Sequence, residues 1–205
     1  MSPDLTSPLN LTLAITGASG SVYAAEMLRA LHADSRVARV NLIVSANSLR
    51  VLAEELNLSG RSNLVEKLLG APSSKIEQHS DADIGASIAS GSYPSAATVV
   101  LPCSMGTLAA IANGLAATLI QRAADVTLKE RRPLILCVRE TPFNRIHIRN
   151  MQLASDAGAV IYPCIPTFYD HPQTTRDMAH NFVHRVLAHI GLPQPDAFTW
   201  QPDKT

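Results

Sequence analysis

The sequence has no excess of charge of either sign and only three cysteines. Lysine plus arginine and aspartate plus glutamate each number 17 among the 205 residues, so no net field draws the chain toward nucleic acid. Basic residues gather only locally, at 129–132 and 139–149, which suits a small anionic ligand better than a polymer. The cysteines, Cys103, Cys137 and Cys164, are odd in number and lack CxxC spacing, so we expect buried thiols in a reducing compartment.

Long hydrophobic runs are also missing. No stretch reaches the roughly 18 apolar residues of a membrane span, and the N-terminus lacks the charged and then apolar pattern of a secretory signal. We therefore predict a cytoplasmic protein with no membrane partner. The length of the chain suits one α/β domain with a core of useful size.

Strand-like and helix-like segments alternate along the whole chain. Short apolar runs predict buried strands, and apolar residues spaced three and four apart predict helices. Strands are expected at about 11–16, 37–44, 96–101, 133–138 and 159–161. Helices are expected at about 23–31, 48–56, 62–69, 107–131, 146–157 and 174–190. This alternation predicts a single doubly wound parallel sheet, Rossmann-like or flavodoxin-like, with helices on both faces.

Polar segments flank the predicted domain. We divide the chain into an N-terminal arm (1–10), one domain (11–192) and a C-terminal tail (193–205). The stretch 81–94, rich in Ser, Gly and Ala, is expected to be a long ordered loop. Thr141 is expected to cap the following helix, with Pro142 at its first position. The only tryptophan, Trp200, lies in the tail, where we expect it to dock on a neighbouring subunit.

Polar side chains follow the predicted strands where each strand ends. Ser19 lies in a glycine-rich turn, Ser45 ends the second strand, Ser104 and Thr107 follow the central strand, and Arg139 ends the next. Because the carboxyl ends of parallel strands meet at one sheet edge, we expect these groups to converge on one crevice. Two hydroxyl-bearing turns at helix starts, with a guanidinium nearby, suit a phosphomonoester attached to a polar ring. The second strand does not end in the acidic residue that binds an adenosine ribose, which favours a mononucleotide.

Several of these residues also have simpler explanations. Ser19 and Ser45 are typical helix caps. Glu140 is a candidate acid or base, or half of a surface ion pair with the preceding arginine. His180 and His184 fall four residues apart on the last predicted helix, as metal ligands often do. No third ligand accompanies them in the sequence, so we expect a solvated helix face and no metal.

Six blocks of sequence together resemble the UbiX-type flavin prenyltransferases, a flavoprotein family once described as aromatic acid decarboxylases, with a cysteine-decarboxylase-like fold. The blocks are GASG (17–20), PCSMGTL (102–108), RAADVTLKE (122–130), RETP (139–142), IH and NM (146–147 and 150–151) and PTFY (166–169). They occur in the family's order through residues 11–192 without a large gap. The third and fourth blocks are the most specific.

The resemblance implies a prenyltransferase, a transferase of alkyl groups other than methyl. Such an enzyme joins dimethylallyl monophosphate to reduced FMN at N5 and C6 and releases phosphate, with no metal. The product, prenylated FMN, is the cofactor of UbiD-type decarboxylases, which serve ubiquinone biosynthesis or aromatic acid breakdown. Members are usually homododecamers with sites at subunit junctions, so a neighbouring chain is expected to complete each pocket. Monophosphate and pyrophosphate donors both fit this interpretation.

The same resemblance assigns residues to the site. The FMN-binding residues would be Gly17, Ala18, Ser19, Ser45, Ser104, Met105, Gly106, Thr107 and Arg139. The dimethylallyl phosphate would be bound by Arg122, Lys129, Arg139, Glu140, Tyr169 and Arg185. The catalytic residues would be Ser19, Glu55, Lys129 and Glu140. Ser19 would lie near flavin N5, Glu55 would approach from the helix after the second strand, and Glu140 would manage a proton on phosphate.

This assignment makes physical sense. An allylic phosphate ionises toward a delocalised cation, so cationic donors on the departing oxygens lower the barrier. An apolar or aromatic wall, with Tyr23 and Trp200 as candidates, would shield that cation from water. One departure from the family stands at 116–118, where Ala-Ala-Thr replaces the usual pair of Asn or Asp followed by Asn, which puts the local structure in question.

Two other functions compete with this one. An FMN-dependent cysteinyl decarboxylase would share the fold and the flavin but would need a catalytic histidine at a strand-loop position. His147 is the nearest candidate, yet it lies in the family's own block. A non-catalytic FMN carrier would have no use for Lys129, Glu140, Tyr169 and Arg185 together.

Overall fold

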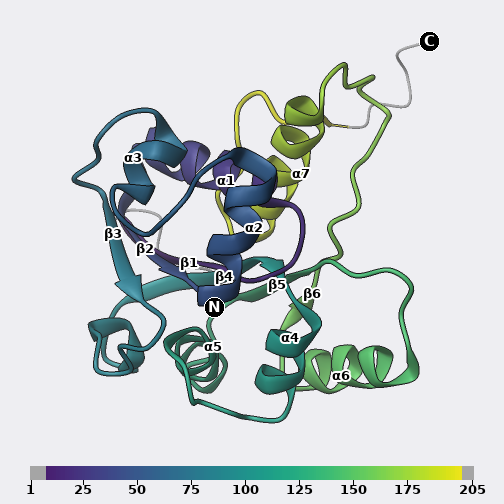
Figure 1. The fold of residues 1–205 in the computed structure, drawn as a ribbon. Helices are drawn as coiled ribbons and strands as arrows, with labels where there is room; N and C mark the ends of the chain where they lie inside the picture. The colour runs from purple at the N-terminus through teal and green to yellow at the C-terminus, as the bar shows by residue number, and fades with distance from the viewer. Residues whose placement is uncertain (1–7, 200–205) are drawn as a thin grey trace.

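The computed structural model describes residues 8–199, which form one six-stranded sheet in the order β3-β2-β1-β4-β5-β6 (Figure 1). The strands are β1 (Leu9–Ile15), β2 (Val37–Val44), β3 (Ile76–Ser80), β4 (Ser95–Cys103), β5 (Leu134–Val138) and β6 (Val160–Ile161). Each pair of neighbouring strands is parallel. The predicted parallel sheet is therefore confirmed, and its strand order is that of a doubly wound nucleotide-binding fold.

Helices cover both faces of this sheet. They are α1 (Ser21–Ala33), α2 (Ala46–Leu56), α3 (Leu64–Leu69), α4 (Met105–Ala112), α5 (Leu119–Lys129), α6 (Arg145–Asp156) and α7 (Thr175–His189), with a short 3-10 helix η1 (Ser87–Ala89). In Figure 1, α1, α2, α3 and α7 lie above the sheet, whereas α4, α5 and α6 lie below it. The prediction of helices on both faces is confirmed.

The core is divided by the sheet into two hydrophobic clusters. In β1, Leu13 and Ile15 pack with Leu28 of α1 and Phe182 of α7 on one face, whereas Ala14 belongs to the cluster on the other face. This alternation follows from the two-residue period of a strand. Because both faces are buried, the central strands have near-continuous apolar sequences, which is why they could be recognised.

The prediction of one long helix at 107–131 is wrong, because two helices occupy this stretch. Helix α4 ends at Ala112, and the side chain of Asn113 donates a 2.7 Å hydrogen bond back to the carbonyl of Ala109. Gly114 follows with a φ of 69°, a left-handed conformation that ends a helix. The atypical segment 116–118 then starts α5, since the Thr118 hydroxyl accepts a hydrogen bond from the backbone N–H of Gln121.

Three other boundaries differ from expectation. Helix α6 starts at Arg145, so Thr141 and Pro142 do not cap it. Instead Asn144 and His147 form a capping box, in which the Asn144 Oδ1 accepts the His147 N–H at 2.8 Å. Strand β3 lies inside the stretch that the sequence left unassigned, and β1 begins at Leu9, within the segment assigned to the arm. The loop 81–94 contains η1, and Trp200 lies outside the described residues.

Candidate functional site

The strand order places β1 and β4 side by side, and their following helices lie on opposite faces of the sheet. This reversal is where ligands bind in open α/β sheets. The buried side chain of Thr16 joins the two strand ends: its hydroxyl donates to the Pro102 carbonyl at 2.7 Å and accepts the Ser104 N–H at 2.8 Å. Thr16 was not predicted as a site residue, although it directly precedes the glycine-rich turn.

Two glycines allow the turn after β1 to take its shape. A Cβ on Gly17 would lie 2.6 Å from the Cβ of Asn47, so only glycine lets the start of α2 approach the turn this closely. Gly20 has a φ of 118°, which an L side chain rarely adopts. Ala18 between them is buried, and Ser19 is partly exposed. The turn is therefore held against α2, on which Glu55 lies.

Glu55 occupies the start of α1. Its carboxylate accepts the Gly20 N–H at 3.0–3.1 Å and the Ser21 N–H at 2.7 Å. Partial burial opposes ionisation of this carboxyl, but hydrogen bonds from the side chain of Ser19, from Ser21 and from the Gly20 backbone outweigh it and lower its pKa. An anion thus already fills this helix start, which makes it a poor site for a phosphate.

The start of α4 remains suitable for a phosphate. Ser104 caps the helix by accepting the Thr107 N–H at 3.3 Å, and its hydroxyl donates to the Thr107 hydroxyl oxygen at 3.1 Å, which leaves the proton of Thr107 to donate elsewhere. The N–H groups of Met105 and Gly106 lie in the first helical turn, where they have no intrahelical partner. A Cβ on Gly106 would meet no atom within 4 Å, so the backbone there is open to a ligand.

Ser45 has the capping role that its sequence position also allowed. Its hydroxyl accepts the Ser48 N–H at 3.1 Å, and its own N–H donates to the Ile15 carbonyl at 3.1 Å. These contacts place Ser45 beside the end of β1. Contact of Ser45 with a flavin stays a prediction.

Arg139 lies beside the end of β4 because its N–H donates to the Cys103 carbonyl at 3.1 Å. Its side chain is exposed, and its positive charge interacts with the thiol of Cys164. Burial raises the pKa of Cys164 to about 12 although the Arg139 guanidinium opposes this shift. Glu140 is also exposed, with its carboxylate accepting the Thr141 N–H at 2.9 Å.

The cysteines are protonated thiols rather than nucleophiles. Cys103 and Cys137 are fully buried, and burial raises the pKa of each thiol well above its usual range. Cys164 is only partly buried, so the expectation of three buried thiols holds for two of them.

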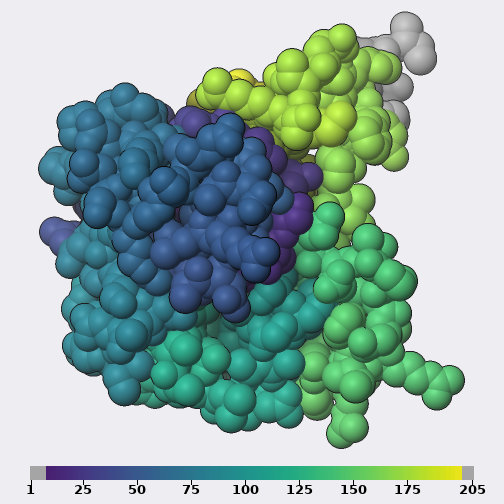
Figure 2. All heavy atoms as spheres, viewed as in Figure 1, coloured from purple at the N-terminus to yellow at the C-terminus, as the bar shows by residue number. Residues whose placement is uncertain are grey.

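A second group of predicted residues lies on α7 and on the loop after β6. Tyr169 and Arg185 line a cavity of about 360 Å³ with Thr167 and Phe198. Phe198 was not predicted, because the tail offered no motif. Figure 2 shows the yellow-green chain after β6 standing out from the upper right of the molecule. Ile165 on this loop is 68 % exposed, and Phe168 and Tyr169 are also exposed, which is typical of a surface that another chain covers.

Aromatic rings from α1, from α7 and from the residue after β6 pack together. The ring of Phe182 lies 4.8 Å from that of Tyr23 and 5.4 Å from that of Tyr162, measured between centroids. Burial raises the pKa of both tyrosines, while the charge of Arg139 opposes the rise at Tyr23 and that of Arg185 opposes it at Tyr162. The two arginines thus flank one aromatic cluster.

Lys129 lies at the other edge of the sheet, at the end of α5, whereas Arg122 lies near the start of that helix. Helix α5 ends at Lys129 and leads into the first residue of β5, whereas Arg139 follows the last residue of β5. Five residues of strand separate these edges by roughly 16 Å. Arg122 donates to the Ala89 carbonyl at 3.0 Å and pairs with Asp125 at 2.7 Å, and Lys129 pairs with Glu130 at 2.5 Å. A single chain therefore does not bring Lys129 to the strand-end groups, and the partners of Arg122 are residues outside those groups.

The fold and the paired strand-end turns define a doubly wound nucleotide-binding protein. A family model described as Flavoprotein matches residues 2–188. The chain is 44% identical over 193 residues to the flavin prenyltransferase UbiX of Salmonella typhimurium, covering 93% of this chain and 97% of that protein. It is 41% identical over 202 residues to the same enzyme of Pseudomonas aeruginosa, covering 96% of each. The chain therefore belongs to the UbiX flavin prenyltransferase family of flavoproteins.

Solved structures agree with this assignment. A dodecameric FMN-dependent UbiX-like decarboxylase from Escherichia coli O157:H7 superposes with a TM-score of 0.84 at 38% identity, covering 94% of this chain and 100% of that one. AnUbiX (PadA1) in complex with FMN and dimethylallyl pyrophosphate also gives 0.84, at 36% identity, covering 94% and 97%. The cypemycin decarboxylase CypD, at 16% identity and a TM-score of 0.57, shares the fold alone. Within residues 8–199, no helix is long and apolar enough to cross a membrane.

Proposed function

We propose that this protein is a flavin prenyltransferase that joins a dimethylallyl group to reduced FMN. The observation that carries the proposal is the pairing of two helix starts at the β1–β4 junction. One start is filled by the Glu55 carboxylate, and the other, at α4, is capped by Ser104 and open at Gly106. Membership of the UbiX family and the likeness to AnUbiX with its two bound ligands support the same conclusion.

FMN would be bound across this junction. The backbone N–H groups of Met105 and Gly106 and the hydroxyl groups of Ser104 and Thr107 would hold its phosphate. Gly17, Ala18, Ser19, Ser45 and Arg139 would surround its ring system. Bound reduced FMN supplies the electron-rich N5 and C6 atoms to which the dimethylallyl group becomes attached.

Ser19 and Glu55 would move the proton that leaves N5. Ser19 donates its hydroxyl proton to the Glu55 carboxylate, so its oxygen lone pairs are available to accept a proton from the flavin. Glu55 is ionised and can take up that proton through the Ser19 hydroxyl, and its hydrogen bonds make it a weak base that readily releases the proton again.

Cationic side chains would stabilise the departing phosphate. As the allylic C–O bond breaks, its electron pair leaves with the phosphate oxygen, and Arg139, Arg185 and Tyr169 would donate hydrogen bonds to that anion. Glu140 would act as an acid or base toward the phosphate oxygens. Tyr23, whose ring packs against Phe182, would form part of the wall that excludes water from the allylic cation.

A neighbouring chain would supply Lys129, because one chain holds it at the opposite sheet edge, together with Arg122 from the same helix. The dodecameric E. coli relative and the exposed apolar loop at 165–169 support a site at a subunit junction. We further propose that the homo-oligomer works in the cytoplasm and that a UbiD-type decarboxylase receives its product.

Anaerobic incubation with reduced FMN and dimethylallyl monophosphate, followed by mass analysis of the extracted flavin, tests the proposal. A gain of one five-carbon unit is the expected result, and a parallel reaction with the pyrophosphate identifies the preferred donor. Tightly bound but unchanged flavin would indicate a carrier instead. Decarboxylation of a cysteinyl peptide, with no change in the flavin, would indicate the decarboxylase.

A further inference from the structure

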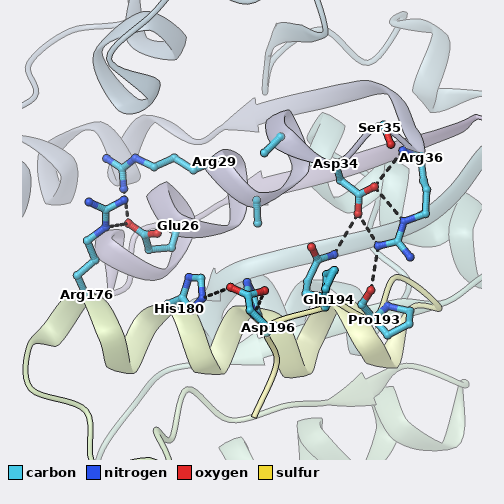
Figure 3. Close-up of a pocket in the computed structure, with 14 residues that line it drawn as sticks. Glu26, Arg29, Asp34, Ser35, Arg36, Arg176, His180, Pro193, Gln194 and Asp196 are labelled. Atoms are coloured by element: carbon cyan, nitrogen blue, oxygen red, sulfur yellow. Dashed lines mark hydrogen bonds and ion pairs between the residues drawn. The ribbon is translucent and has the colours of Figure 1, made fainter. Parts of the chain in front are cut away.

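A cavity of about 560 Å³ lies between α1, α7 and the segment 193–196 (Figure 3). The residues proposed to bind FMN or the allylic phosphate do not line it. His180 and His184 of α7 face this cavity, and Asp196 reaches it from the C-terminal segment. The sequence analysis found no third ligand for the two histidines because Asp196 lies sixteen positions after His180.

The three side chains present their ligand atoms to one another. The Nε2 of His180 lies 3.2 Å from an Asp196 carboxylate oxygen, and the Nδ1 of His184 lies 3.6 Å from the other. All three ligand atoms fall within 4.8 Å of one another. The two imidazole rings approach to 3.8 Å between centroids. Such proximity is what a shared ion requires.

His184 carries the second, independent observation. Its side chain is only 6 % exposed, and its Nδ1 is buried without a hydrogen-bond partner. The 3.6 Å separation from Asp196 is too long for a hydrogen bond. A buried nitrogen without a partner is costly, so a ligand that it can bind would remove an energetic penalty.

We infer that His180, His184 and Asp196 form a site for a divalent transition-metal ion such as Zn²⁺, with water as the fourth ligand. Tetrahedral zinc with bonds of about 2.0–2.1 Å places its ligand atoms roughly 3.3 Å apart. The 3.2 Å and 3.6 Å contacts reach different oxygens of Asp196, so these side chains would move closer together on binding the ion. Two imidazoles and one carboxylate favour zinc, cobalt or nickel over magnesium or calcium, which prefer oxygen ligands alone.

The surrounding charges agree with a three-residue site. Glu26, the nearest buried carboxylate in the cavity, is already neutralised by Arg29 at 2.5 Å and Arg176 at 2.8 Å, as Figure 3 shows. The charge of Glu26 is therefore already balanced, and we do not count this carboxylate among the ligands of the ion.

Metal binding would fasten the C-terminal segment to α7. Asp196 is 66 % exposed, and its side chain holds the segment to the helix through His180. Phe198, two residues later, lines the cavity that contains Tyr169 and Arg185. An ion on Asp196 would thus limit the positions open to Phe198.

Titration of the metal-free, untagged full-length protein with Co²⁺ tests the inference. We expect one cobalt per chain with the visible absorption of a four-coordinate ion, displacement by Zn²⁺, and a rise in Tm of about 5 °C with zinc in excess. His180→Gln and Asp196→Asn should each weaken binding at least about tenfold. Both side chains are substantially exposed, so these variants should fold.

An exposed histidine and an exposed aspartate outside the proposed site provide matched controls. His189→Gln changes another histidine of α7, and Asp156→Asn changes an exposed carboxylate at the end of α6, and both should bind cobalt as the unmodified protein does. Absence of saturable cobalt binding would overturn the inference. So would binding that His180→Gln and Asp196→Asn leave unchanged.

Discussion

Replacing Glu55 by glutamine separates its structural contribution from its catalytic one. Glutamine keeps one oxygen that can accept a hydrogen bond from the start of α1, but it loses the charge and the second acceptor. Hydrogen bonds to a charged group contribute about 1.5–3 kcal/mol when they are buried, and a charge at a helix start about 0.3–1 kcal/mol. Glu55 is exposed, so solvent screening reduces the loss to about 1 kcal/mol.

That loss corresponds to a fall in Tm of about 2–4 °C in a domain of this size, which calorimetry can measure. If Glu55 accepts the flavin proton through Ser19, removal of its charge should slow prenylated flavin formation about 100-fold or more. Anaerobic single-turnover reactions with flavin mass as the readout measure this rate. Glu54→Gln, at the neighbouring exposed position, serves as the control and should keep both the full rate and the Tm.

The pH dependence of the same variant gives a second check. The folded-state pKa of Glu55 is below its ordinary value of 4.5, so its stabilisation is complete above pH 4.5 and is lost as the pH falls through the lower folded pKa. Glu55→Gln should therefore differ from the unmodified protein at neutral pH and approach it in acid. Full activity in Glu55→Gln would refute the proton-transfer role, whatever happens to stability.

Three further substitutions follow from the geometry. Gly17→Ala would bring a Cβ within 2.6 Å of the Asn47 Cβ, so urea unfolding should show a loss of about 1–3 kcal/mol, and an unchanged midpoint would contradict the close approach. Gly106→Ala meets no neighbouring atom and should preserve stability, yet fluorescence titration should show FMN binding weakened about tenfold or more because the methyl group blocks the phosphate. Asp34→Asn removes a carboxylate whose pKa is lowered mainly by its hydrogen bond to Arg36; the variant should lose about 1 kcal/mol at pH 7, and this difference should begin to shrink below pH 3.8 and disappear only as the pH falls through the lower folded-state pKa.

The central strands could be predicted because each is buried on both faces and is therefore apolar throughout. Strand β3 could not, because it lies at the sheet edge and contains Glu77, Gln78 and His79 among its five residues. The break between α4 and α5 had a signal in the Asn113-Gly114 pair, which is typical of a turn, but apolar residues on both sides obscured it. Pairing with β2 therefore determines β3, whereas the break between α4 and α5 is set by its own turn.

The strand-end residues of the site could be predicted for a different reason. A parallel sheet gathers the residues after its strands, so Ser19, Ser104 and Arg139 lie at the same sheet edge whatever their distance in sequence. Lys129 precedes a strand instead, and its separation from Arg139 follows from the same topology. Asp196 approaches α7 through a tail that has no regular structure, and no periodic pattern reports such a contact.

Mixed oligomers test most directly the claim that the reaction site joins two chains. The single variants K129A and R139A should each be inactive, because each lacks a cation that binds the departing phosphate. Co-assembly of the two in equal amounts should restore both groups together at about one quarter of the junctions, and prenylated flavin should form at about one quarter of the unmodified rate. Co-assembly of K129A with the double variant K129A/R139A is the control and should stay inactive. Formation of prenylated flavin near the one-quarter level supports the account, whereas a mixture no more active than its parents would contradict it.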